Sequence, residues 1–200
     1  MTDPFAHDRF LVEQLLRPVV NLYRVSPLAE GDTAAGEPVA FVRQKRMKIK
    51  EDIRFFADEA ESEELFRIKA RQVFEIGGRY DVTTADGTRV GVLEKVFGRS
   101  LLRSTWRVLD ADEQALATAQ ERSLPMAIAR RLVDFVPYGE LVPIPYNFDI
   151  LVDGARVGGM MRKFQLRDRY VLDLSGDPDR RIDRRVAVAL AIGLDTLQNR

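Results

Sequence analysis

The chain has 200 residues but no cysteine and only one histidine, His7. Without cysteine it cannot form a disulfide framework, a thiolate nucleophile or a zinc–thiolate site. A lone histidine also argues against a histidine-based dyad or triad and against a facial metal triad. We therefore expect a protein that is not an enzyme and holds no metal ion or cofactor. The lack of cysteine fits a reducing compartment, so we expect a cytoplasmic location.

Net charge and long apolar runs are also missing. The 31 basic and 31 acidic residues cancel, so no overall field favours nucleic acid or a membrane, and an electrostatic partner must recognise a local patch. No apolar run approaches the roughly 18 residues of a membrane-spanning helix. The first ten residues include Asp3, Asp8 and Arg9, so no secretory signal is expected there. The hydrophobic fraction of 46% can still build a core.

A repeated phrase organises the chain. A cationic or amide residue precedes an apolar one, and an aromatic or aliphatic residue opens a strand several positions later. Internal repeats of this kind indicate a fold built by iterating one supersecondary unit. The copies are Arg46–Ile49 with Ile53, Gln72–Ile76 with Tyr80, Arg162–Leu166 with Tyr170, and a looser one, Lys95–Phe97 with Trp106.

Short alternating segments predict a series of β-hairpins. Asp86-Gly87 and Asp153-Gly154 are the clearest turns, because glycine accepts the positive φ that a tight hairpin needs. Many short strands at regular spacing indicate a closed or nearly closed β structure. The expected strands number about eleven: Val19–Val25, Val39–Gln44, Ile53–Ala57, Leu65–Ala70, Tyr80–Thr84, Val90–Lys95, Trp106–Leu109, Ala115–Gln120, Phe148–Val152, Arg156–Met161 and Tyr170–Leu174.

Two segments outside the hairpin series are expected to be helical. Apolar residues recur at helical spacing until Pro18, which predicts a short helix before Arg17. Residues 1–18 would then be an N-terminal tail, mobile over Met1–Asp8, and a helix ahead of the domain 19–200. Ser123–Phe135 lacks alternation and can be capped by Ser123, so an extra helix near 123–136 is expected within an insertion spanning 123–146.

The C-terminal segment predicts a third helix, over residues 178–198, beginning at Asp177-Pro178. Its nine consecutive apolar residues, Val186–Leu194, leave it no polar face. A helix that is apolar all round is buried on every side or lies in a membrane. Charges bracket this run closely, which would be costly in hydrocarbon. We therefore expect a helix buried inside a barrel.

A β meander around an apolar C-terminal helix resembles the tubby C-terminal-like superfamily, and most closely its bacterial LURP-one-related and phospholipid scramblase-like members. The resemblance implies a mainly β (α+β) fold: a twelve-stranded antiparallel closed barrel around a central helix. It also implies binding of lipid or a membrane surface. The segment 123–146 departs from a bare barrel. The similar phrases are Lys50–Phe56, Lys95 with Ser100–Trp106, Arg167–Tyr170, and Asp183–Arg185 with Leu194–Gln198.

A basic cluster is the main candidate site. Its members are Arg43, Lys45, Arg46, Lys48 and Lys50. If the chain is extended there, the last three share one face and could bind phosphoinositide or other anionic headgroups, at about 1 kcal/mol per cation near a charged surface. The alternative is a solvated strand face whose charge is balanced by nearby acidic residues.

The expected helix at 123–135 is the second candidate. It places Leu132 and Phe135 on an apolar face beside Arg130 and Arg131. This composition is typical of an interfacial amphipathic helix that anchors a protein at a membrane surface. The alternative is a lid whose apolar face packs on the barrel.

Three smaller features favour structural roles. Asp110/Asp112 and Asp177/Asp179 lie in expected turns, where aspartate forms local hydrogen bonds. Gly158-Gly159 predicts a bulge or strand bend. Arg79-Tyr80 and Arg169-Tyr170 occupy equivalent repeat positions, so each arginine is expected to cross the barrel rim to a carboxylate; the alternative is a pair of binding sites.

Together these observations predict a non-enzymatic module that binds a phospholipid headgroup or membrane surface. Its partner would be an anionic phospholipid, with no nucleic acid, and its location cytoplasmic and peripheral on the inner face of the membrane. The alternative is a cytosolic scaffold or protein-interaction domain without lipid specificity, which would have a protein partner.

Overall fold

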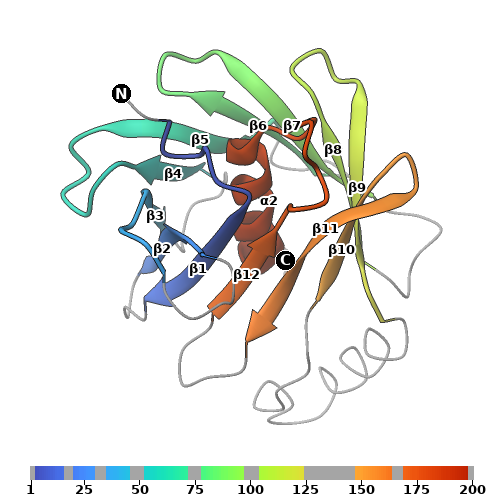
Figure 1. Cartoon of the computed structure of the whole chain (residues 1–200). Coiled ribbons are helices and arrows are strands. Elements are labelled where there is room, and N and C mark those ends of the chain that lie inside the picture. The colour runs from blue at the N-terminus through green and yellow to red at the C-terminus, as the bar shows by residue number, and fades with distance from the viewer. Residues whose placement is uncertain are drawn as a thin grey trace, which may run out of the picture.

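A computed structural model describes residues 3–15, 20–29, 35–45, 52–71, 78–96, 104–123, 147–163 and 169–197. Over these residues twelve antiparallel strands form a closed barrel around one helix (Figure 1). The strands are β1 (Arg9–Leu15), β2 (Val20–Pro27), β3 (Ala40–Lys45), β4 (Asp52–Phe56), β5 (Glu64–Ala70), β6 (Arg79–Thr84), β7 (Arg89–Lys95), β8 (Thr105–Leu109), β9 (Ala115–Glu121), β10 (Phe148–Val152), β11 (Ala155–Lys163) and β12 (Arg169–Asp173).

Strand order follows the sequence, and the pairing of β1 with β12 closes the barrel. Alternate side chains point inward because successive residues of a strand face opposite sides. On β5, for example, Phe66 and Ile68 are buried inside while Arg67 faces outward. Closure leaves no unpaired strand edge in the sheet. The closed twelve-stranded barrel expected from the family resemblance is therefore confirmed.

The prediction for the N-terminal segment is wrong. Arg9–Leu15 forms strand β1 and not a short helix. It is the one strand of the twelve that is missing from the eleven predicted. Both neighbours, β2 and β12, pair with it along most of its length, and these two ladders outweigh a helical pattern of only seven residues. Residues 3–8 are not a free tail either, because Phe5 is buried with its ring 5.5 Å from that of Phe66.

The central helix, α2 (Arg184–Thr196), runs through the barrel. Val188, Leu190, Ile192 and Leu194 are all buried although they point in different directions, as the apolar run predicts. Its 13 residues give a length of about 20 Å. No helix among the described residues is long and apolar enough to cross a membrane.

The helix begins later than residue 178. Arg180 has a left-handed backbone, with φ at 50°, which no helix accommodates. The carboxylate of Asp177 also accepts the backbone N–H groups of Arg181 and Ile182 and so holds a turn instead of a first helical turn. Asp183 is the actual cap, since its carboxylate accepts the Arg185 N–H at 2.8 Å.

Arg184 fixes the first turn of α2 to the barrel. Its guanidinium donates five hydrogen bonds: two to the same oxygen of the Asp8 carboxylate, one to the Asp177 carboxylate, and one each to the backbone oxygens of Asp177 and Ile182. Its side chain is only 1% exposed. A cation at a helix N-terminus opposes the helix dipole, so this arginine stabilises the docking of α2 and not the helix itself.

Asp195 plays the matching part at the other end of α2. Its carboxylate accepts the hydroxyls of Tyr23 on β2 and Tyr170 on β12. An acid near a helix C-terminus also opposes the dipole. Lys95 on β7 compensates by donating to the Leu197 carbonyl at 3.3 Å, and burial lowers the pKa of this lysine. The two polar ends therefore set the depth of an otherwise featureless apolar helix.

The smaller predictions about strands and turns are confirmed. Gly87 and Gly154 have φ of 92° and 80°. The register of β10 against β11 shifts between Ile150 and Leu151, opposite Gly158, where a Cβ would lie 2.1 Å from the Asp173 oxygen. The two repeated arginines each contact a carboxylate, but the partner is the directly opposite glutamate on the neighbouring strand and does not lie across the barrel rim: Arg79 pairs with Glu94 at 2.8 Å and Arg169 with Glu13 at 2.7 Å.

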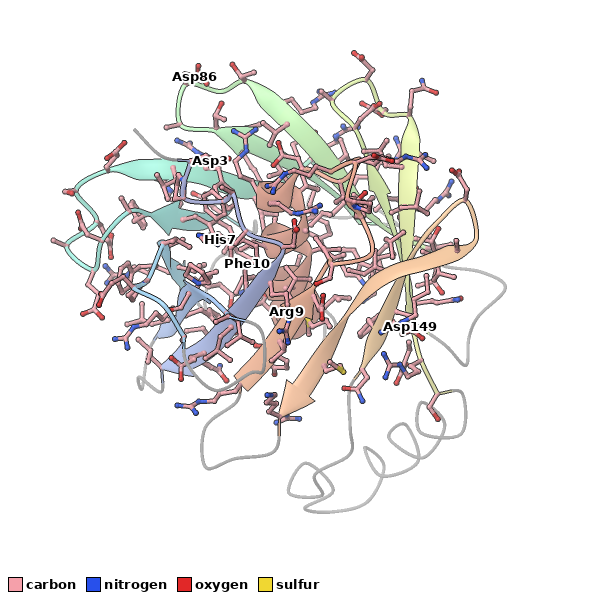
Figure 2. The ribbon with its side chains drawn as sticks, viewed as in Figure 1. Asp3, His7, Arg9, Phe10, Asp86 and Asp149 are labelled. Atoms are coloured by element: carbon pink, nitrogen blue, oxygen red, sulfur yellow. The ribbon has the colours of Figure 1, made fainter. Side chains whose placement is uncertain are left out.

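Because neighbouring strands run in opposite directions, successive connections alternate between two ends of the barrel. The end that holds Arg184 and the β6–β7 turn is here called the acidic end; Asp86 marks it in Figure 2. The opposite end holds Asp195. All four copies of the repeated phrase precede even-numbered strands, β4, β6, β8 and β12, and these strands begin at the opposite end. The repeating unit is therefore one hairpin.

Candidate functional site

The structure describes part of the predicted basic cluster. Arg43 lies on β3, faces outward and is exposed. Lys45 is the last residue of β3, and its side chain is outside the described part. Arg46, Lys48 and Lys50 also lie outside the described residues, between β3 and β4. The strand ends that flank them, Lys45 and Asp52, are at the opposite end of the barrel.

Strand register brings two further arginines beside Arg43. Arg43 on β3 pairs directly with Arg54 on β4, and Arg54 pairs directly with Arg67 on β5. Cross-strand neighbours have Cβ atoms about 5 Å apart, and like charges in such positions destabilise a sheet. These three residues are here called the arginine row. A row that costs stability is the kind of local conflict expected at a functional site.

Two carboxylates that are less exposed than the arginine row offset part of the repulsion between its guanidinium groups. Arg54 contacts Asp52 at 3.1 Å and Glu64 at 3.4 Å, and Arg67 contacts Glu64 at 2.5 Å. Asp52 and Glu64 are only 19% and 15% exposed, whereas the side chains of Arg43, Arg54 and Arg67 are 42%, 44% and 29% exposed. The hydrogen bond from Arg54 to Asp52 raises the pKa of this arginine further. The guanidinium groups therefore form the accessible layer.

A groove borders the arginine row on the outer wall. It has a volume of about 220 Å³ and is lined by residues of β1, β2 and β3, the end of β4 and the β4–β5 turn. Its lining includes the outward-facing Leu15, Leu22, Phe41 and Phe56, together with Tyr23 and Val42. Arg43 lines it too, so the row and the groove share one residue. Its remaining polar lining is Asp58, Glu59 and Glu61 of the turn.

Sequence reasoning did not include Arg54 and Arg67 in the site, although Arg54 lies only four residues after Lys50. Only the pairing of β3 with β4 and of β4 with β5 places them next to Arg43. One signal was available: each alternates with buried residues, Ile53 and Phe55 around Arg54, which marks it as outward-facing. The register itself cannot be derived from that alternation.

The other predicted site cannot be placed. Arg130, Arg131, Leu132 and Phe135, together with the helix expected near 123–136, lie outside the described residues. The flanking strands, β9 ending at Glu121 and β10 beginning at Phe148, put both ends of this insertion at the opposite end of the barrel.

Charge is divided unequally between the two ends. The described connecting segments at the acidic end are 3–8, 28–29, 35–39, 57–63, 85–88, 110–114, 153–154 and 174–183, and they contain fifteen acidic and two basic residues. In the sequence, the segments that join strands at the opposite end contain eleven basic and five acidic residues. The connections at the two ends therefore differ in the sign of their charge, although two residues of acidic-end turns reach basic residues farther along the wall: Glu113 contacts Arg71 at 2.8 Å, and Glu61 contacts Arg43.

Among the residues described, no group of three or more His, Asp or Glu side chains is arranged so that it could hold a metal ion. His7 is exposed and lies edge-on to the Phe10 ring, 6.4 Å away, near the start of β1 (Figure 2). A hollow of about 570 Å³ at the acidic end is lined by charges of both signs, including Asp110, Asp183 and Arg185. Arg185 and Asp183 pair with each other there, at 2.6 Å.

Comparison with family models places most of the chain in one family. The model described as LURP-one-related matches residues 39–195, which run from just before β3 to the last turn of α2. A comparison with curated proteins finds no match. The matched region includes the arginine row, most of the barrel and the central helix. The chain belongs to the LURP-one-related family.

Proposed function

We propose that this protein is a non-enzymatic module that binds anionic phospholipid headgroups at a membrane surface. The binding surface comprises the predicted cluster, Arg43, Lys45, Arg46, Lys48 and Lys50, extended along the outer wall by Arg54 and Arg67. The arginine row is the observation that carries the proposal. Guanidinium groups bind phosphate through paired, planar hydrogen bonds. Three of them lie side by side on the outer face of β3–β5, and they are more exposed than Asp52 and Glu64, the carboxylates beneath them.

The difference in charge between the two ends would orient the protein on the membrane. An anionic membrane repels the acidic end and attracts the opposite end, which carries the connection between β3 and β4. The protein then meets the membrane with the cluster at its surface and with the β6–β7 turn and the segment 174–183 directed away, while the turn 57–63 reaches along the wall to Arg43. Each cation near such a surface contributes about 1 kcal/mol. Three lysine or arginine side chains thus give about 3 kcal/mol, or roughly a hundredfold in partitioning.

The insertion 123–146 is proposed as the second contact, since both of its ends are at the same end of the barrel. If it anchors the protein, replacing Leu132 and Phe135 with Ser should reduce retention on vesicles and leave the denaturant melt nearly unchanged. If it is a lid, truncating either to Ala should cost about 2–5 kcal/mol of stability. Denaturant melts of the Ser and Ala variants, together with vesicle flotation of the same variants, separate these two outcomes.

The proposed function is tested by flotation with zwitterionic vesicles and with vesicles that also contain anionic lipid. Only the anionic vesicles should retain the protein, and added salt should release it because exposed charges are screened. Changing Arg46, Lys48 and Lys50 to Gln should lower retention about a hundredfold.

The matched control changes Arg89, Arg156 and Arg181 to Gln. These arginines are 40%, 55% and 46% exposed and lie toward the acidic end, so the variant loses the same net charge without touching the proposed surface. Retention should stay near that of the unmodified protein. Equal retention on both kinds of vesicle, or equal losses in the two variants, would instead favour a scaffold without lipid specificity.

A further inference from the structure

We propose that the groove beside the arginine row takes up one hydrocarbon chain, so that the ligand is an anionic amphiphile with its phosphate on Arg43 and its chain on Leu22, Phe41 and Phe56. This inference rests on the proposed function and narrows it. Surface binding needs only a headgroup, whereas this site also requires a chain that leaves the bilayer.

The groove is apolar where a strand's outer face would ordinarily be polar. Leu22, Phe41 and Leu15 are outward-facing and only half-buried. The turn 57–63 folds over this part of the wall and buries Phe56 on its outer side. Apolar lining with a few polar groups at one edge is the usual composition of a small-ligand site. Such a site binds a chain through the surface it removes from water.

The acidic residues of the turn do not make the groove a cation site, because each already has a partner. Glu59 contacts Arg24 at 3.0 Å, and Asp58 accepts the backbone N–H and the hydroxyl of Ser62. Glu61 accepts from Arg43. The contacts with Arg24 and Arg43 hold the turn against the wall, whereas the bonds between Asp58 and Ser62 lie within the turn.

The pair between Arg43 and Glu61 is the exchangeable contact. Both side chains are solvent-accessible, and pairs between exposed groups contribute little to stability. A phosphate offers more charge and more acceptor oxygens than one carboxylate, so it can replace Glu61 on the guanidinium. Arg54, directly opposite Arg43 on β4, adds a second cation within reach of the same phosphate.

The size of the groove limits the chain. Sites for drug-sized ligands have volumes of about 300–1,000 Å³, and this groove has about 220 Å³. It therefore accommodates one short stretch of a single chain and not the two chains of an intact diacyl lipid. A monoacyl phosphate, or one chain of a lipid partly drawn from the bilayer, fits this volume.

The test titrates the whole protein with octyl phosphate, inorganic phosphate and octyl glucoside and follows backbone and methyl NMR signals. Octyl phosphate should bind about tenfold more tightly than either other probe and should shift the signals of Leu22, Phe41 and Arg43. Arg43→Gln and Leu22→Ser should each weaken binding about tenfold. Similar affinities for all three probes, or shifts confined to other residues, would overturn the proposal.

Glu61→Gln gives the sharpest result, because it should tighten octyl phosphate binding several-fold by freeing Arg43. The control is Glu63→Gln, which removes the same charge from the same turn at a residue that does not line the groove. The proposal is wrong if Glu61→Gln weakens octyl phosphate binding. It is also wrong if a short peptide of alternating Lys and Leu binds the groove more tightly than octyl phosphate, because the groove is then a site for basic partners.

Failure of this inference is distinguishable from failure of the proposed function. If the protein floats with anionic vesicles while octyl phosphate leaves Leu22 and Phe41 unshifted, headgroup binding stands and the chain site is refuted. If the vesicles fail to retain the protein but octyl phosphate binds in the groove, the membrane function is refuted and a site for a free amphiphile remains.

Discussion

Replacing Arg184 with Met tests how the helix is held in the barrel. Methionine keeps the apolar stem of the side chain but removes all five N–H donors. Asp177, whose side chain is 3% exposed, then becomes a buried carboxylate without its cation. Removing one partner of a buried ion pair costs about 3–5 kcal/mol. For a chain of this size, each kcal/mol shifts the melting temperature by about 2–4 °C, so a fall of roughly 6–20 °C is expected.

The pH dependence of the same variant adds a signed check. Burial alone raises the pKa of Asp177, but the bonds from Arg184 and from the Ile182 and Arg181 N–H groups outweigh it, and the net pKa is lowered. A lowered pKa contributes stability above the unfolded-state value of about 4, which is lost as pH falls through the folded-state value. Without Arg184, burial is opposed only by the two backbone N–H bonds, so the pKa of Asp177 is expected to rise. The loss of stability caused by Arg184→Met should therefore become smaller as the pH falls from about 7 to about 5.

Chemical and thermal denaturation at several pH values measure both effects. Arg185→Met is the matched control, because Arg185 is the next residue and its pair with Asp183 is accessible, with side chains 35% and 33% exposed; it should cost less than about 1 kcal/mol. Arg184→Met combined with Asp177→Asn should recover part of the loss. If Arg184→Met melts like the control at neutral pH, the clamp at this end of α2 does not stabilise the fold.

Other changes test the remaining parts of the fold. Leu190→Asp places an unpaired charge inside the barrel and should abolish folding; a variant with an unchanged melting temperature and monomeric elution would contradict the central-helix account. Tyr23→Phe and Tyr170→Phe each remove a hydroxyl that Asp195 accepts, so each should cost about 1.5–3 kcal/mol and speed amide exchange in the last turn of α2. Gly158→Ala places a Cβ against the Asp173 oxygen, so a melt within about 0.5 kcal/mol of the unmodified protein would contradict the close approach of β11 to β12.

The sequence predicted best where local pattern and tertiary demand agree. Asp86-Gly87 and Asp153-Gly154 mark real turns because the backbone conformation there is one that glycine alone adopts easily. Val186–Leu194 predicted burial because an apolar helix has no stable place in water. In both cases a short segment contains the physical reason for its structure.

Prediction failed where the deciding partner is distant in the chain. Arg9–Leu15 has apolar residues on both faces, a pattern that fits a helix as well as a strand, and only its pairing with β2 and β12 selects the strand. The start of α2 was misplaced because Asp177 binds Arg184, seven residues on, and does not cap a first turn. The arginine row follows from the register between three strands, which no local pattern contains.

The most direct test of the proposed membrane function is the depth of two labels on vesicles. The chain has no cysteine, so Lys69→Cys, on β5 beside the arginine row, and Asp86→Cys, at the acidic end, each carry one fluorophore. A quencher fixed to the lipid headgroups should quench the label at position 69 on anionic vesicles and leave it bright on zwitterionic ones, while the label at position 86 stays bright on both. Equal quenching at the two positions, or quenching at position 86 alone, would contradict docking through the basic surface.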